Sequence, residues 1–274
     1  MLGALIIVFR EVFEAGLIVG IVMAVTRGVH GRGAWIGGGL IAGVLGACAV
    51  AIFAGALSAA FEGAGQELFN AAILGLAAVM LTWHNVWMAR HGRELAAEMR
   101  AVGQAVVAGS KSLLGLAIVV AVAVLREGVE VVLFLYGIVA SEGGSGAGVL
   151  VGGLAGLVAG TAVGALAYFG LLNIPGRHLF AVTSFMIAFL AAGMALQATA
   201  FLEQANAVST LGTVVWDTSR YLPDTSIVGR ALRTLLGYSD RPTALQLVVY
   251  ASTLAVIFAL MKLLAPTPRT APAH

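Results

Sequence analysis

The sequence R-E-V-F-E at residues 10–14 places three ionisable side chains inside an apolar stretch that runs from residue 2 to residue 26. The sequence R-E-G-V-E at residues 126–130 repeats the pattern inside a second apolar stretch, residues 113–140. Both motifs lie near the middle of their stretches, so a helix rising about 1.5 Å per residue places them roughly 15–20 Å from either end, the depth of a bilayer midplane. An ionised side chain there costs about 2.5–3.5 kcal/mol on insertion scales, so two matching clusters indicate a function.

Side chains three or four positions apart share one face of a helix. Glu11 and Glu14 therefore point the same way, with Arg10 beside Glu14, and the second motif repeats this arrangement. Two motifs that face each other would present four carboxylates and a net charge of about −2, which suits a hard cation bound by oxygen atoms. The alternative is a set of structural ion pairs between helices, which would not need a second glutamate on each helix.

The composition of the whole chain is that of a membrane protein. Its 274 residues are 60% hydrophobic and 10% charged, with a mean hydropathy of +1.00, whereas soluble domains carry about 25% charged residues. We therefore expect an all-α polytopic membrane protein with no soluble catalytic domain. The first apolar stretch lacks a basic n-region, so we expect it to be kept rather than cleaved as a signal peptide. A single cysteine, Cys48, excludes an intramolecular disulfide and argues against a thiolate metal site.

Seven apolar stretches are long enough to cross a bilayer as helices. They are residues 2–26, 35–61, 67–89, 113–140, 147–171, 179–203 and 243–264. Seven crossings put the two termini on opposite sides of the membrane. One side carries nine Lys and Arg residues and the other side four. Because basic residues accumulate on the cytoplasmic side, this predicts an outer N-terminus and a cytoplasmic C-terminus.

The two charged motifs are 116 residues apart, and three helices separate equivalent positions, so the copies run in opposite directions through the membrane. This predicts a 3+3 inverted repeat plus one C-terminal helix, a transporter design with its site at the midplane. We expect a single transmembrane domain over residues 1–264. Its parts are a first repeat at about 1–112, a second at about 113–204, an outer loop at 205–242 and a last helix at 243–264, followed by a disordered tail at 265–274.

Glycines recur at every fourth position in two of the apolar stretches. Gly39 and Gly43 lie in the second stretch, and the fifth carries Gly148, Gly152, Gly156, Gly160 and Gly164. Such faces let helix backbones approach closely. We expect these glycine ladders to be structural and to hold the two charged helices together.

Seven acidic residues fall on the predicted outer side, where they would draw cations towards the mouth of a pathway. Six are candidates for this role: Glu62, Glu67, Glu142, Glu203, Asp217 and Asp224. The alternative is that each is an ordinary solvated loop acid. His84 is the one histidine well placed in a span. It is a candidate ligand or proton relay on the inward path, with a hydrogen-bonded packing histidine as the alternative.

Two connections are long enough to carry structure of their own. Residues 88–112 are polar and basic, and we expect a cytosolic hairpin there. The loop at 204–242 is too long for a plain connection. Within it, Ser226 is the expected N-cap of a short amphipathic helix that Gly237 stops. This helix would serve as a lid over the bundle or as a docking surface for an outside partner.

The paired R-E-x-x-E motifs are accompanied by W-H-N-V-W-M at residues 83–88 and A-A-G-M-A-L-Q-A-T-A-F-L-E-Q at residues 191–204. With these motifs the chain resembles, over nearly its whole length, the high-affinity iron permeases of the oxidase-dependent iron transporter family, the fungal ferric permeases and their bacterial relatives. The resemblance implies iron-binding carboxylates at Glu11, Glu14, Glu127 and Glu130, with Arg10 and Arg126 as their charge partners. It also implies an outside partner that oxidises or delivers iron.

These features together predict an iron permease, not an enzyme, in a bacterial inner membrane. It would import Fe(III), or alternatively Fe(II), with iron as its substrate and without a cofactor. The expected partners are iron, the lipid bilayer and an outer-face iron oxidase or iron-delivery protein; nucleic acid is not expected, and assembly with further copies of the chain is compatible with the sequence.

Three alternatives to iron import stay open at this stage. Carboxylates alone are not selective, so lead, manganese and zinc are alternative cargoes. An intramembrane metalloenzyme would need an open metal position and a base that activates water. A membrane anchor for an outer redox partner would leave the midplane charges unexplained.

Overall fold

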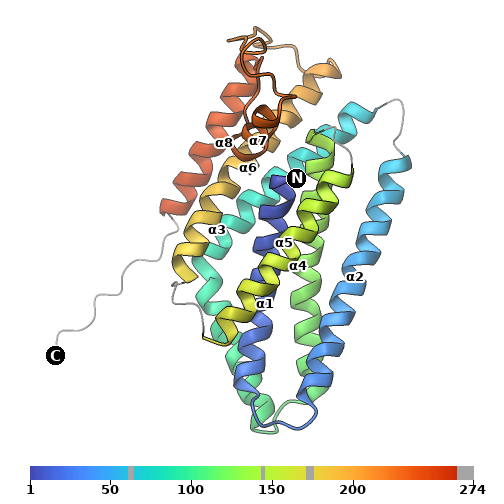
Figure 1. The fold of residues 1–274 in the computed structure, drawn as a ribbon, viewed down its shortest axis with the longest axis vertical. Helices are drawn as coiled ribbons and strands as arrows, with labels where there is room; N and C mark the ends of the chain where they lie inside the picture. The colour runs from blue at the N-terminus through green and yellow to red at the C-terminus, as the bar shows by residue number, and fades with distance from the viewer. Residues whose placement is uncertain (61–64, 143–145, 171–175, 264–274) are drawn as a thin grey trace, which may run out of the picture.

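A computed structural model describes residues 1–60, 65–142, 146–170 and 176–263. Among these residues, all regular secondary structure is helical, apart from one isolated β-bridge between Val214 and Thr243. The helices are α1 (Leu2–Val25), α2 (Arg32–Ala60), α3 (Gln66–Val107), α4 (Leu113–Glu142), α5 (Gly146–Tyr168), α6 (Gly176–Gln204), α7 (Ile227–Leu236) and α8 (Ala244–Leu263) (Figure 1). The predicted all-α fold is confirmed. The predicted tail, residues 265–274, lies outside the described residues.

Five helical stretches of the described residues are long and apolar enough to cross a membrane. They are Arg32–Ala56 in α2, Gln66–Met88 in α3, Gly146–Tyr168 in α5, Val182–Gln204 in α6 and Ala244–Leu263 in α8. Helices α1 and α4 are of comparable length, 24 and 30 residues, but the ionisable residues of the two motifs interrupt their apolar composition. The predicted membrane class is therefore confirmed, whereas the count of seven spans stays a prediction.

Helix α3 is longer than the sequence suggested. It continues for 42 residues to Val107, through most of the segment at 88–112 that was expected to form a polar hairpin. That segment is rich in Ala, Arg, Glu and Met and contains no proline, so its residues favour a helix even though they are polar. The helix ends where Gly109 adopts a positive φ of 74°. The expected hairpin is therefore wrong, and a short turn joins α3 to α4.

Each glycine ladder packs against one of the two charged helices. A Cβ atom at Gly156 of α5 would lie 2.9 Å from the backbone nitrogen of Phe9 in α1, and one at Gly43 of α2 would lie 2.7 Å from the carbonyl oxygen of Ala121 in α4. Only glycine permits such close backbone contact. The ladders thus join α5 to α1 and α2 to α4, which corrects the expectation that they hold the two charged helices to each other.

The charged motifs lie between two apolar cores. One core contains Ile7 of α1 and Phe134 of α4, together with side chains of α3 and α6. The other contains Ile18 of α1 and Val124 of α4, together with the C-terminal part of α3. On both helices the motif residues lie between these positions. Helices α1 and α4 run in opposite directions and contact each other, so their motifs meet at one level (Figure 1).

The loop after α6 folds over one end of the bundle (Figure 1). Its short helix α7 begins after Ser226, whose side chain accepts a hydrogen bond from the backbone nitrogen of Gly229, and it ends at Gly237 with a φ of 69°. Both predicted helix ends are confirmed. Arg233 of α7 contacts Gln197 of α6 at 3.2 Å and Asp224 at 3.4 Å, so α7 is attached to the bundle.

Candidate functional site

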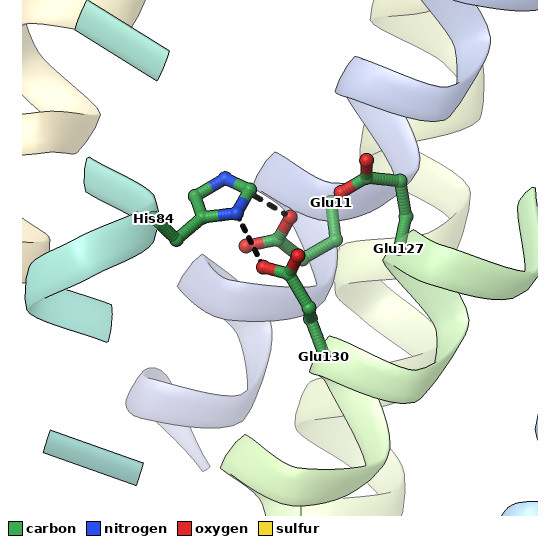
Figure 2. Close-up of side chains that lie close together, drawn as sticks. All are labelled: Glu11, His84, Glu127 and Glu130. Carbon is green, nitrogen blue, oxygen red and sulfur yellow. Dashed lines mark ion pairs between the residues drawn. The ribbon is translucent and has the colours of Figure 1, made fainter. Parts of the chain in front are cut away.

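Four buried side chains from three helices converge where the two motifs meet. Glu11 comes from α1, His84 from α3, and Glu127 and Glu130 from α4 (Figure 2). None of the four is more than 7% exposed. One ligand atom from each residue lies within 4.8 Å of the others. Ligand atoms on opposite sides of one ion are about 4–5 Å apart, twice the usual metal–ligand distance. The group therefore has the size needed to hold a single metal ion.

The convergence follows from helix geometry and packing. The spacing of Glu127 and Glu130 puts both carboxylates on one face of α4, and the two glycine ladders keep α2 and α5 close to the outer sides of the charged helices. The α3 backbone is fixed next to the site by Asn85, which is fully buried and donates from its Nδ2 to the carbonyl oxygen of Ser184 in α6 at 2.9 Å. His84, the preceding residue, is thereby directed towards α1 and α4.

Glu14 lies at the edge of this group. Its Oε1 accepts a hydrogen bond from Nε of Arg10 at 2.7 Å, and Arg10 is only 1% exposed. Its Oε2 lies 3.4 Å from Nε2 of His84. The structure thus groups three of the four expected carboxylates with one histidine, while Glu14 lies between an arginine and that histidine. The ligand role of all four carboxylates stays a prediction.

The second arginine is placed differently from the first. The side chain of Arg126 is 40% exposed, and its Nε lies 3.4 Å from Oε1 of Glu130 and 4.0 Å from Oε1 of Glu127. Its guanidinium lies over the ring of Trp87, 4.6 Å from the ring centroid, which is a cation–π contact. The two motifs are thus alike in sequence but unlike in environment: Arg10 is buried and Arg126 reaches the surface.

Many polar atoms of this cluster have no hydrogen-bond partner among the described residues. They are Nη1 and Nη2 of Arg10, both carboxylate oxygens of Glu11, and Oε2 of Glu127, whereas Oε2 of Glu14 and Oε2 of Glu130 lie against the ring nitrogens of His84. Buried polar groups are normally hydrogen-bonded, because an unpaired one costs about 1–3 kcal/mol and a charged one more. A concentration of unpaired carboxylate oxygens in one place indicates a site arranged for a cation.

The position of His84 was only partly foreseen. The sequence placed it near the inner end of a span that was expected to finish at residue 89, on an inward path or as a packing residue. Since α3 continues to Val107, His84 is an interior residue of a long helix, and it contacts Glu130 through Nδ1 and Glu14 through Nε2. The sequence would have placed His84 in the interior if α3 had been predicted to continue to Val107 instead of ending at residue 89.

The outer acids whose side chains the structure describes do not form a group. Glu62 and the side chain of Glu142 lie outside what the structure describes, and Glu67 is exposed in the first turn of α3. Asp224 pairs with Arg233 at 3.4 Å and Asp217 with Arg241 at 2.7 Å. The hydrogen bond from Arg241, together with those from Ser219, holds the pKa of Asp217 well below its ordinary value.

Glu203 has a structural role at the start of α8. It accepts hydrogen bonds from Oγ1 of Thr243 at 2.8 Å and from Nε2 of Gln246 at 2.6 Å. Three of the outer acids therefore hold the outer loop and its neighbouring helices together. Their predicted part in drawing cations stays a prediction.

Known proteins similar to this chain are iron permeases. The model of the iron permease FTR1 family matches residues 1–267. The ferrous iron permease EfeU of Yersinia pestis is 31% identical over 250 residues, which cover 89% of this chain and 87% of that protein. The proteins of the same name from Escherichia coli O6:K15:H31 and Shigella sonnei are 30% and 31% identical, with 89% of both chains covered. No solved structure matches the chain. The match over nearly all of its length shows that this chain belongs to the iron permease FTR1 family.

Proposed function

We propose that this chain imports Fe(II) across a bacterial inner membrane through a midplane site formed by the carboxylates of Glu11, Glu127 and Glu130, with Glu14 at its edge. The observation that carries the proposal is the buried group of ligand atoms within 4.8 Å of one another, in which carboxylate oxygens lack hydrogen-bond partners. Chelation by these carboxylates would offset the loss of the ion's hydration shell. Iron is the cargo here, and no chemical conversion is required.

The ferrous ion is preferred over the ferric ion on the strength of the relatives. The sequence alone favoured Fe(III) by its resemblance to fungal ferric permeases, whereas the bacterial relatives that match most of this chain are named ferrous iron permeases. The membrane potential assists either ion and does not favour Fe(II): a divalent ion gains about 4.6 kcal/mol from 100 mV, at about 2.3 kcal/mol per charge. Entry of Fe(II) therefore needs no ATP.

The proposed transport cycle moves one inverted repeat against the other around the fixed site. The helix contacts support it, because they are related in the way that two repeats predict. In such a repeat α1, α2 and α3 correspond to α4, α5 and α6, and α1 packs on α5 as α4 packs on α2, while α3 packs on its own counterpart α6. It is further supported by the two apolar cores that flank the motifs, since an ion crosses such layers only when packing on one side opens. In this proposal α1 and α4 complete seven spans, with the N-terminus outside and the C-terminus in the cytoplasm.

An outside protein that delivers iron, or oxidises it, is part of the proposal. The loop after α6 supports it, because this loop is held to the bundle by Arg233 and Glu203 and carries exposed aromatic side chains, Trp216 and Tyr221. Aromatic residues of this kind are enriched in protein interfaces. Assembly of the permease with further copies of the same chain is a secondary part of the proposal.

The test is uptake of radioactive iron into proteoliposomes under a membrane potential, with Fe(II) kept reduced by ascorbate and Fe(III) offered separately as its citrate complex. We expect the wild type to take up Fe(II), and Glu11→Gln and Glu130→Gln to reduce uptake to the level of empty liposomes. Glu98→Gln is the matched control, because it removes the same charge from an exposed position of α3 and should leave uptake unchanged.

Each other outcome has a definite meaning. Uptake that survives both site substitutions at equal protein content would reject the carboxylate site. Uptake of Fe(III) alone would reject the ferrous assignment, and uptake of Mn²⁺, Zn²⁺ or Pb²⁺ in preference to iron would change the cargo.

A further inference from the structure

We propose that His84 is a ligand of the transported ion, and that its nitrogen makes the site prefer Fe(II) and similar transition ions over Mg²⁺, Ca²⁺ and Mn²⁺. This inference deepens the function proposed above and rests on it. Its basis is geometric. His84 is 3% exposed, it comes from a helix that carries neither motif, and it belongs with Glu11, Glu127 and Glu130 to the group that spans 4.8 Å (Figure 2).

The contacts of His84 are not those of a packing histidine. Both of its ring nitrogens face carboxylate oxygens of the motifs: Nδ1 contacts Oε2 of Glu130, and Nε2 lies 3.4 Å from Oε2 of Glu14. The packing contact between α3 and α6 is made instead by its neighbour Asn85. His91, two turns further along α3, lies 3.2 Å through Nδ1 from the carbonyl oxygen of Trp87, as a structural histidine does. His84 alone of these three residues is directed at carboxylates of both motifs.

Glu14 has the position of a residue that orients His84. Its Oε2 lies 3.4 Å from Nε2 of the imidazole, while its other oxygen is held by Arg10 at 2.7 Å. Histidines that bind metals almost always have their second ring nitrogen held by a carboxylate or a carbonyl group, which fixes the ring. The series Arg10, Glu14, His84 thus directs Nδ1 at Oε2 of Glu130, and an ion bound by both atoms would replace their direct contact. This arrangement accounts for the absence of Glu14 from the four-residue group.

A nitrogen ligand changes what the site selects. Carboxylate and carbonyl oxygens suit Mg²⁺, Ca²⁺ and Mn²⁺, whereas imidazole suits iron, zinc, copper and nickel. Three carboxylates alone would therefore accept the abundant alkaline-earth ions, and one imidazole shifts the balance towards later transition ions. The motifs supply charge for any divalent cation, and His84 supplies the discrimination among them.

The experiment measures binding of Co²⁺ and Mn²⁺ to the purified full-length protein in detergent. Co²⁺ substitutes for Fe²⁺ without oxidising, and Mn²⁺ represents ions that prefer oxygen. We expect His84→Gln to weaken Co²⁺ binding about tenfold or more, a change equivalent to about 1.4 kcal/mol, and to leave Mn²⁺ binding within a factor of about three. The matched control is His91→Gln, the same change on the same helix, which should alter neither affinity. Equal weakening of both ions, or of neither, would overturn the proposal.

A second measurement needs no variant at the site and applies if His84→Gln does not fold. Wild-type protein labelled with ¹⁵N-histidine and loaded with Cu²⁺, an ion that imidazole suits, should show the ¹⁵N coupling of a directly bound imidazole in pulsed EPR, and His91→Gln should keep it. Absence of that coupling would refute His84 as a ligand. The two proposals fail separately: iron uptake with an unchanged Co²⁺ preference in His84→Gln rejects this inference alone, whereas selective binding without uptake rejects the transport function alone.

Discussion

Arg10 and Arg126 occupy equivalent positions in two copies of one motif, yet their side chains differ in burial and in contacts. Arg10 is 1% exposed and pairs with Glu14, while the side chain of Arg126 is 40% exposed and lies over Trp87. A buried pair that loses one partner leaves an uncompensated charge, and Arg10 is enclosed by the protein far more completely than Arg126. The two arginines therefore differ in how much stability depends on them.

We predict that Arg10→Gln lowers the free energy of unfolding by about 3–5 kcal/mol, the cost of breaking a buried ion pair. The same substitution at Arg126 should cost less, because its guanidinium is less enclosed and its pair with Glu130 is longer, at 3.4 Å against 2.7 Å for Arg10 and Glu14. Thermal unfolding of both variants in the same detergent compares them directly.

The double substitution of Arg10 and Glu14 by Gln controls for the ion pair itself. It should recover part of the loss, because it also removes the charge that was left unpaired. Equal destabilisation by the two single arginine substitutions would contradict the difference in burial.

At the scale of helices, the glycine ladder of α5 predicts a sharp contrast between two positions. A Cβ atom at Gly156 would lie 2.9 Å from the backbone nitrogen of Phe9 in α1, whereas one at Gly148 would have no neighbour within 4 Å. We expect Gly156→Ala to push α5 away from α1 and to reduce the yield of folded protein. Gly148→Ala should be neutral or stabilising by about 0.5–1 kcal/mol, because alanine favours a helix more than glycine does. Size-exclusion profiles of the two variants give the comparison, and equal profiles would reject the close α1–α5 contact.

A second prediction at this scale concerns the link between α6 and α8. Glu203 accepts hydrogen bonds from Thr243 and Gln246, so Glu203→Ala should lower the free energy of unfolding by about 1.5–3 kcal/mol, the range for hydrogen bonds to a charged group. Iron uptake per folded molecule should stay unchanged, as should the stability of the exposed control Glu67→Ala. A loss of uptake without a loss of stability would instead assign Glu203 to the cation pathway.

At the scale of the whole molecule, the direction of the helices predicts which loops face outwards. The turn between α3 and α4 and the loop after α6 lie at opposite ends of the bundle (Figure 1). Ser110 in that turn and Ser209 in that loop are exposed. In a Cys48→Ser background, we expect an impermeant maleimide applied to spheroplasts to label Ser209→Cys and not Ser110→Cys, because the basic side should be cytoplasmic. The reverse pattern would invert the proposed orientation, and labelling of both positions would contradict their placement at opposite ends.

Sequence reasoning succeeded where the information is local and failed where it is not. The ends of α7 followed from Ser226 and Gly237, since capping depends on a few neighbouring residues. The length of α3 did not follow, because polarity after Met88 was taken as the end of the helix, although helix propensity and polarity are separate properties. The partner of each glycine ladder was also missed, because a small-residue face shows that a helix packs closely but not against which neighbour.

The sequence by itself determined the membrane class, the all-helical fold and the two groups of ionisable residues buried at the middle of their helices, because composition, apolar length and helical spacing are properties of continuous stretches of chain. Only the tertiary structure showed that His84 of α3 lies together with Glu11, Glu127 and Glu130, and that Glu14 accepts a hydrogen bond from Arg10. The physical reason is that side chains from separate helices meet according to the packing of backbones, and here the glycine contacts and the Asn85 hydrogen bond set that packing.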